Sequence, residues 1–138
     1  MIKKKIGYTT GVFDMFHIGH LNILKRAKEQ CDFLIVGVST DELVETYKHK
    51  TPIIPFEERF AIVNSIKYVD KVVPQENMDK LANVKQFGVD VVFVGSDWKG
   101  TPQWNEYERI FKDENCSVVY LEYTQGVSSS TLREKINK

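Results

Sequence analysis

Two of the chain's three histidines fall within one helical turn of each other near the N-terminus. His17 and His20 are three residues apart, so on a helix that begins near His17 both side chains lie on one face. Gly11 and Gly19 lack side chains, so the backbone there can approach a ligand closely. Free N–H groups at a helix start attract phosphate, and two imidazoles can hydrogen-bond phosphate oxygens and, when protonated, neutralise charge in a transition state. The pattern therefore indicates phosphoryl or nucleotidyl transfer.

Two other interpretations of His17 and His20 stay open at this point. A histidine near a helix start is often a solvated or capping residue, and His-x-x-His spacing can hold zinc on a helix, although no third ligand is evident in the sequence. Neither the Walker A pattern nor GxGxxG occurs. Their absence argues against a P-loop kinase and against a dinucleotide-binding dehydrogenase.

Short β-rich runs alternate with amphipathic segments along the chain, and this alternation predicts how the histidines are held. Strands are expected at residues 6–10, 33–39, 71–73, 89–95 and 118–121. Helices are expected at 18–27, 56–66, 81–87 and 107–111, a last short helix behind the capping box of Thr131 and Glu134, and a mobile loop at 45–54. Continuous apolar strands between helices predict an α/β fold with a doubly wound, five-stranded parallel sheet. Such sheets bind ligands beyond the carboxyl ends of the strands where the strand order reverses, and we expect the turn at residues 11–20 to lie there.

The overall composition is that of one folded domain spanning residues 1–138. The chain has 19 basic and 19 acidic side chains, so no global field draws it to nucleic acid. The apolar stretch behind the basic start is broken at once, which predicts neither a signal peptide nor a membrane span. Cys31 and Cys116 lie outside any CxxC pair, so we expect reduced thiols and a cytoplasmic protein.

The predicted strand followed by Gly-x-Phe-Asp-x-x-His-x-Gly-His, at residues 11–20, resembles the cytidylyltransferase family of HxGH nucleotidyltransferases. The similarity is greatest to the branch that acts on glycerol 3-phosphate, and it covers essentially the whole chain. Further segments at 39–42, 58–59, 68–70 and 95–100 fall in the order that this family shows. The resemblance implies a Rossmann-like nucleotidyltransferase fold.

The same resemblance implies transfer of CMP from CTP to a small polyol phosphate such as glycerol 3-phosphate. The acceptor phosphate attacks the α-phosphorus directly and pyrophosphate leaves, so no protein nucleophile is needed. A phosphate monoester, with a second pKa near ~6, is largely dianionic at neutral pH and needs no strong general base. The enzyme then contributes positioning and charge neutralisation, with Mg²⁺ as cofactor. The resemblance also implies a homodimer and a CDP-alcohol product used in cell-surface polymer or lipid synthesis.

A set of site residues is implied by the resemblance as well. Catalytic roles fall to His17, His20, Lys50 and Arg59, and acceptor binding falls to Arg59, Lys67 and Asp70. Nucleotide binding falls to Thr10, Gly11, Phe13, Asp14, Gly19, Lys48, Gly95, Asp97, Thr124, Ser128 and Ser129, with Asp14 also a candidate metal ligand. The alternative is a solvated loop for the lysines, an exposed helix position for Arg59, and a turn or helix cap for the aspartates and serines.

Some positions depart from the family pattern. Tyr123 and Lys67 each stand in place of an arginine, Ser96 in place of an acidic residue, and Met78 in place of a tryptophan. These changes leave the reaction class intact and leave the base and the acceptor open. An adenylyltransferase acting on a sugar or cofactor phosphate, and a catalytically silent nucleotide-binding domain, remain alternatives.

Overall fold

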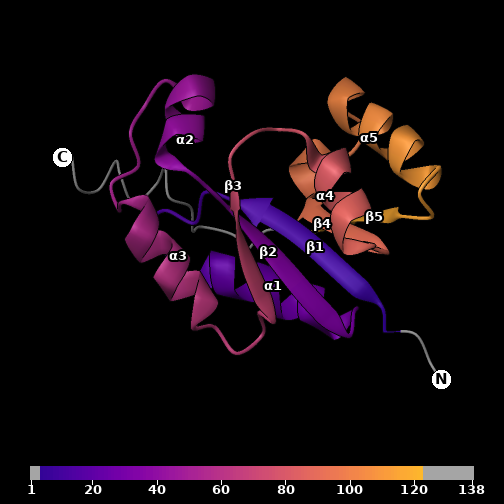
Figure 1. Cartoon of the computed structure of the whole chain (residues 1–138), viewed down its shortest axis with the longest axis horizontal. Coiled ribbons are helices and arrows are strands. Elements are labelled where there is room, and N and C mark those ends of the chain that lie inside the picture. Colours follow the sequence, from indigo (N-terminus) through magenta and orange to yellow (C-terminus); the bar gives the residue numbers. More distant parts are fainter. Residues whose placement is uncertain (1–3, 123–138) are drawn as a thin grey trace.

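One parallel sheet organises the chain. The computed structural model describes residues 4–122. Its strands are β1 (Ile6–Gly11), β2 (Phe33–Ser39), β3 (Lys71–Gln75), β4 (Val91–Gly95) and β5 (Ser117–Leu121). They pair in parallel in the order β3-β2-β1-β4-β5, as Figure 1 shows. Because the chain moves outward from β1 to β3 and then returns to the other side of β1, the strand order reverses between β1 and β4.

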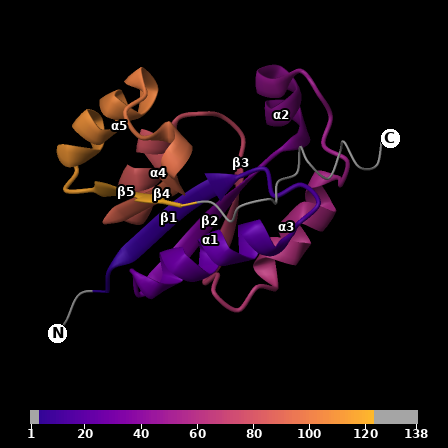
Figure 2. The same ribbon diagram turned by 180° about the vertical axis from the view of Figure 1, so that it is seen from behind.

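Helices cover both faces of the sheet, which confirms the predicted doubly wound α/β architecture. On one face lie α1 (Ile18–Glu29) and α3 (Phe56–Asn64), and Figure 2 shows them in front of the strands. On the other face lie α4 (Lys80–Phe87) and α5 (Pro102–Lys112). Each pair of helices closes its own apolar core, built around Leu24, Val63 and Phe93 on the α1 face and around Tyr8, Trp104 and Phe111 on the α5 face.

The segment after β2 differs from the sequence-based expectation. Residues 45–54 were predicted to be a loop, but residues 45–48 form the last turn of α2 (Asp41–Lys48). Thr40 caps the start of this helix, accepting a hydrogen bond from the N–H of Leu43 at 3.2 Å, and His49 ends it with a φ of 55°. Figure 1 shows α2 beyond the carboxyl edge of the sheet. Leu43 and Val44 are the buried residues of this helix. A short 3₁₀ helix, η1 (Ser96–Trp98), follows β4 at the same edge.

Other expectations concern the cysteines, the chain's end and the membrane. Cys31 and Cys116 are both free thiols, as expected. The predicted helix at Thr131 and Glu134 lies outside the described residues. None of the helices described is long and apolar enough to cross a membrane.

Candidate active site

His17 and His20 together cap the first helix. His17 is the N-cap of α1, and its Nδ1 accepts a hydrogen bond from the N–H of Gly19 at 3.0 Å. Nδ1 of His20 accepts in turn from the backbone N–H of His17 at 3.2 Å. Because Nδ1 is an acceptor on both rings, the proton of each neutral imidazole is on Nε2. The cap thus fixes both histidines as Nε2–H donors at the carboxyl end of β1.

Burial lowers the pKa of both imidazoles. The rings stack with centroids 3.9 Å apart. Loss of solvent lowers the pKa of His17, and it lowers the pKa of His20 to about 4, with a further lowering from His17 and an opposing effect of the Asp14 carboxylate. Nε2 of His17 is buried and has no hydrogen-bond partner among the described residues. A buried donor without an acceptor is uncommon in proteins, and a phosphate oxygen would satisfy it.

The loop between β1 and α1 is held in a strained shape. Phe13 and Met15 have φ values of 54° and 50°, in the left-handed region that residues other than glycine seldom adopt. The Phe13 ring is buried and packs edge-on against His20, with centroids 5.4 Å apart. A Cβ on Gly11 would come within 3.0 Å of this ring. Phe13 and Gly11, which were predicted to bind nucleotide, therefore also set the position of His20.

Asp14 holds the connection between α2 and α3. Its two carboxylate oxygens accept hydrogen bonds from the N–H groups of Ile53 and Ile54, each at 2.9 Å, and only 4% of the residue is exposed. Among residues 4–122 no three His, Cys, Asp or Glu side chains come together as a metal site. Both oxygens of Asp14 thus help to fix the backbone before α3, and the predicted metal-binding role of Asp14 stays a prediction.

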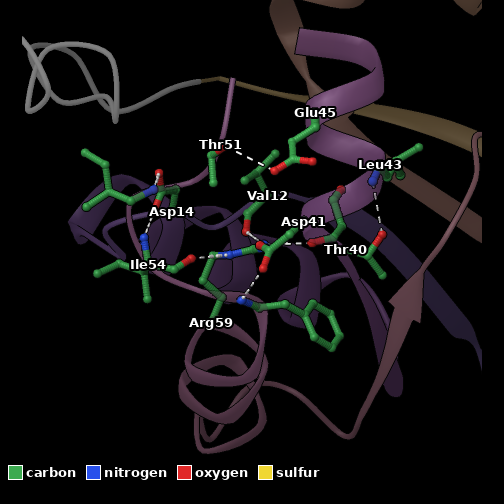
Figure 3. A network of polar contacts seen from close by, with 12 residues as sticks. Val12, Asp14, Thr40, Asp41, Leu43, Glu45, Thr51, Ile54 and Arg59 are labelled. Carbon is green, nitrogen blue, oxygen red and sulfur yellow. Dashed lines mark hydrogen bonds and ion pairs between the residues drawn. The ribbon is translucent and has the colours of Figure 1, made fainter. Parts of the chain in front are cut away.

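Arg59 lies at the centre of a buried polar network (Figure 3). Its Nε donates to the carbonyl of Ile54 at 2.8 Å, and Nη1 donates to the carbonyls of Val12 and Ser39, both at 2.7 Å. Nη2 pairs with the Asp41 carboxylate at 2.6 Å, and 1% of the residue is exposed. The sequence predicted a contact between Arg59 and the acceptor phosphate. In the structure the guanidinium ties four chain segments together, which is a positioning role, and its contact with the acceptor phosphate stays a prediction.

A cavity of about 480 Å³ opens at the carboxyl edge of the sheet, on the face covered by α4 and α5. Thr10, Gly11 and Lys48, all predicted nucleotide-binding residues, lie in its wall. His17 and His20 are not part of this wall, since they belong to α1 on the opposite face.

Lys80 is a cavity residue that the sequence did not reveal. It is the first residue of α4 and is only 6% exposed. Nζ donates to Oγ1 of Thr10 at 2.7 Å and lies 5.9 Å from the ring centre of Trp104. Burial lowers the pKa of Lys80 to about 8. Within the part of the chain that the structure describes, no carboxylate pairs with this ammonium group.

Comparison with known proteins agrees with this geometry. The model of the family described as cytidylyltransferase-like matches residues 8–135. The chain belongs to this family. It is 38% identical over 136 residues to the glycerol-3-phosphate cytidylyltransferase of Bacillus subtilis, covering 98% of each chain. It is also 38% identical over 129 residues to the enzyme of the same name from Staphylococcus aureus, covering 93% of this chain and 92% of the relative.

A solved structure supports the fold of this cytidylyltransferase-like chain. The lipopolysaccharide core biosynthesis protein from Thermoplasma volcanium superimposes with a TM-score of 0.73 at 26% sequence identity. The match covers 88% of this chain and 98% of the other. The predicted Rossmann-like nucleotidyltransferase fold is confirmed.

Two acceptor-binding residues predicted from the family lie far from the histidines. Asp70 pairs with Lys28 at 2.5 Å and accepts a hydrogen bond from the N–H of Leu34, at the start of β2. Lys67 lies in the same region, with its Nζ 5.2 Å from the ring centre of Tyr68. This is the amino edge of the sheet, about 20 Å from the carboxyl edge for strands of this length. Lys67 and Asp70 thus lie away from the histidines within one chain, and their role in acceptor binding stays a prediction.

The remaining predicted residues of the cytidylyltransferase-like site are distributed as follows. Lys50 is exposed behind α2 and is not in the cavity wall, while Gly19 is buried in the first turn of α1. Gly95 ends β4 and Asp97 is exposed in η1, so both stand at the carboxyl edge. Thr124, Ser128 and Ser129 lie outside the described residues. No contact in the structure tests the roles predicted for these residues.

Proposed function

We propose that the protein transfers CMP from CTP to a small polyol phosphate such as glycerol 3-phosphate and releases pyrophosphate. The observation that carries the reaction class is the capped pair of neutral imidazoles, His17 and His20, at the point where the strand order reverses. The choice of CTP and glycerol phosphate rests on the similarity to two glycerol-3-phosphate cytidylyltransferases over nearly the whole chain.

The two histidines act as fixed donors in this proposal. The acceptor phosphate oxygen forms a bond to the α-phosphorus of CTP, and the bond from that phosphorus to the bridging oxygen of pyrophosphate breaks. Nε2–H of His17 and of His20 donate to oxygens of the reacting phosphates, and the N-terminus of α1 adds its positive end. Since the donors are oriented before substrate arrives, little reorganisation is needed during the reaction.

Mg²⁺ enters, in this proposal, as the complex with the triphosphate of CTP. The described residues offer no cluster of carboxylates that would hold the ion alone. Mg²⁺ is commonly bound through one or two carboxylates together with substrate phosphates and retained waters. The ion is therefore part of the substrate, and it neutralises charge on the leaving pyrophosphate.

The assignment further includes a homodimer, a cytoplasmic location and a CDP-alcohol product consumed in cell-surface polymer or lipid synthesis. These parts rest on the resemblance to the glycerol phosphate branch. Gel filtration coupled to light scattering would measure the mass in solution, and a monomer at micromolar concentration would contradict the dimer.

A pyrophosphate-release assay tests the function directly. Four nucleoside triphosphates are combined with a panel of alcohol and sugar phosphates, with Mg²⁺ present throughout. We expect glycerol 3-phosphate with CTP to give the fastest release, and kcat/KM for CTP to exceed that for ATP by at least about tenfold, which requires ~1.4 kcal/mol. A preference for ATP with a sugar phosphate would move the assignment to an adenylyltransferase. Tight CTP binding without pyrophosphate release would indicate a regulatory domain.

A further inference from the structure

Two side-chain hydrogen bonds join helix α4 to strand β1. Nδ2 of Asn83 donates to the hydroxyl oxygen of Tyr8 at 2.9 Å, and Nζ of Lys80 donates to Oγ1 of Thr10 at 2.7 Å. Tyr8 and Thr10 are two residues apart, so they share a face of β1. Lys80 and Asn83 are three residues apart, so they share a face of α4. The two bonds therefore lie one after the other along the helix, and together they determine where α4 lies along β1.

The bond between Tyr8 and Asn83 lies behind the cavity at the carboxyl edge. Among the described residues, the cavity wall includes Thr10 and Lys80 but neither Tyr8 nor Asn83. Tyr8 is 0% exposed and belongs to the core under α4 and α5. The buried hydroxyl thus has no access to a ligand, and it can influence the cavity only through the position of α4.

We propose that the bond between Tyr8 and Asn83 is a positioning contact for the reaction, because it holds α4 at one place along β1 and so keeps Lys80 at the cavity. The inference rests on the proposed function, which it extends to two residues outside the cavity. Tyr8 and Asn83 are positioning residues in this proposal, and they touch neither substrate.

The burial of the Tyr8 hydroxyl makes the position of α4 specific. Within residues 4–122, the bond from Asn83 is the one hydrogen bond found for this hydroxyl. Burial raises the pKa of Tyr8 to about 12, although the bond from Asn83 acts in the opposite direction, so the hydroxyl stays neutral. Apolar packing is non-directional, whereas a hydrogen bond weakens steeply with distance and angle. Of the contacts between α4 and the core, the bond to Tyr8 therefore discriminates most strongly between neighbouring positions of the helix.

Gly37 provides the space that the hydroxyl occupies. In the sheet Tyr8 is paired with Ile35 of β2, and Gly37 lies two residues further towards the carboxyl edge. A Cβ on Gly37 would come within 2.9 Å of the Tyr8 hydroxyl and 3.1 Å of Cγ2 of Thr10. The aromatic ring is rigid and buried, so it cannot turn away from such a side chain at little cost. A side chain at position 37 would thus push the hydroxyl away from Asn83.

Lys80 depends closely on the position of α4. It is the first residue of this helix, and Asn83 follows it by three residues, about 4.5 Å along the helix axis. Nζ of Lys80 lies 2.7 Å from Oγ1 of Thr10 and 5.9 Å from the ring centre of Trp104. A shift of α4 by about 1 Å away from Thr10 would lengthen the first contact beyond hydrogen-bond range. The bond one turn along the helix opposes such a shift.

The test breaks the bond from each side, with Tyr8→Phe and with Asn83→Leu. Gln86→Leu is the matched control, because Gln86 is an exposed amide on the same helix. The first measurement is the pKa of Lys80 by NMR, from the ε-carbon resonance that is missing in Lys80→Arg. We expect both test variants to raise this pKa from about 8 towards the ordinary value of 10.5, because Lys80 gains solvent when α4 is free to shift. Gln86→Leu should leave it unchanged.

The second measurement is kcat/KM for pyrophosphate release from CTP with glycerol 3-phosphate. It is made under conditions in which urea titration shows each variant to be fully folded. We expect Tyr8→Phe and Asn83→Leu to lower kcat/KM by about 5- to 30-fold, and Gln86→Leu to stay within about threefold of wild type. A bond that served stability alone would lower the free energy of unfolding and leave both measurements unchanged in the folded protein.

Gly37→Ala extends the test through a double-mutant cycle. In the wild-type background the added methyl group meets the Tyr8 hydroxyl, and we expect kcat/KM to fall about as far as in Tyr8→Phe. In the Tyr8→Phe background the methyl group enters the space that the hydroxyl has left, so the further effect should be small. Because independent substitutions have additive effects, additivity here would reject the role given to Gly37.

Two results would overturn the proposal. One is a pKa of Lys80 in Tyr8→Phe that equals that of wild type. The other is a kcat/KM in Tyr8→Phe within about threefold of wild type. Tyr8→Phe removes a single oxygen atom, so it decides the case if Asn83→Leu does not give the wild-type circular dichroism spectrum.

Failure of this inference can be told apart from failure of the proposed function. If wild-type protein releases no pyrophosphate with any phosphate tested, the proposed function is wrong. The NMR titration of Lys80 needs no substrate, so it still shows whether the bond between Tyr8 and Asn83 positions this side chain. A raised pKa in both test variants supports the positioning contact, and an unchanged pKa rejects it.

Discussion

The imidazole rings of His17 and His20 lie face to face, 3.9 Å apart, while each side chain closes a hydrogen bond that begins α1. Helix capping and ligand donation therefore use different nitrogens of the same rings. This geometry is compatible with both the capping and the catalytic interpretation of these histidines. Nδ1 of each ring accepts a capping hydrogen bond, and the N–H at Nε2 is available to a ligand.

Substitution of His17 can separate the two roles. Asparagine is a favourable N-cap residue, whereas alanine is not. We expect His17→Asn to keep the free energy of unfolding near that of wild type and His17→Ala to lose about 1 kcal/mol. Both variants should lower kcat by about two to four orders of magnitude, since each removes a preorganised donor. Urea unfolding and single-turnover pyrophosphate release provide the two readouts. Near-normal turnover in His17→Asn would restrict the residue to capping.

Acid should destabilise the protein through His20. Burial lowers its pKa from 6.5 to about 4 in the folded state, so the unfolded chain binds more protons between these values. The contribution of buried, neutral His20 to the free energy of unfolding is complete above pH 6.5 and is lost as the pH falls towards 4. On its own it amounts to about 2–3 kcal/mol. Urea titrations of wild type and His20→Asn from pH 7 to pH 4 should show a smaller loss in the variant. Parallel curves would contradict the burial of a neutral His20.

The pH profile of the reaction should report Lys80, which lines the cavity at the carboxyl edge. The pKa of Lys80 is about 8 in the free protein, and the ammonium form is the one that attracts phosphate. We therefore expect kcat/KM for the substrate whose phosphate enters the cavity to fall as the pH rises through about 8. The other titratable side chains in the cavity wall are Tyr47 and Lys48, both from α2.

Lys80→Arg supplies the matched control for that profile. Arginine stays protonated throughout the range, so its profile should be flat between pH 7 and about 9. A descending limb that persists unchanged in Lys80→Arg would assign the titration to a group other than Lys80.

Loss of Arg59 should destabilise the fold more than any surface substitution. Removing the guanidinium leaves the carboxylate of Asp41 and the carbonyls of Val12 and Ser39 without their buried donor. We expect Arg59→Met to lower the free energy of unfolding by about 3–5 kcal/mol, and Arg59→Lys to be destabilising as well, because an ammonium group lacks the planar fork.

Arg109→Lys is the control for Arg59. Its ion pair with Glu106 is exposed on α5, and exposed pairs contribute little. The midpoint of urea unfolding should therefore change within experimental error in Arg109→Lys. If the midpoint of urea unfolding in Arg59→Met also equals that of wild type, the network around Arg59 contributes little to stability.

The sheet could be predicted from the sequence because its strands carry continuous apolar runs between clear helical patterns. Helix α2 could not, since Leu43 and Val44 are its buried residues and a pattern that short resembles a loop. The position of Asp70 in the fold could not be predicted for a different reason. It directly precedes β3, so the parallel topology puts it at the amino edge, whereas the family motif alone carries no information about edges. Lys80 was missed because its burial arises from contacts with Thr10 and Trp104, which are distant in sequence.

The network around Arg59 also limits how the molecule can be redesigned. Arg59 bonds to the β1–α1 loop, the end of β2, the start of α2 and the segment before α3. An insertion that displaces one of these segments leaves a buried N–H or carboxylate unsatisfied, which costs about 1–3 kcal/mol. Loops grafted from another protein to change the acceptor must therefore be exchanged as a complete set. The η1–α5 connection has no bond to Arg59 and is the position at which a single graft should be tolerated.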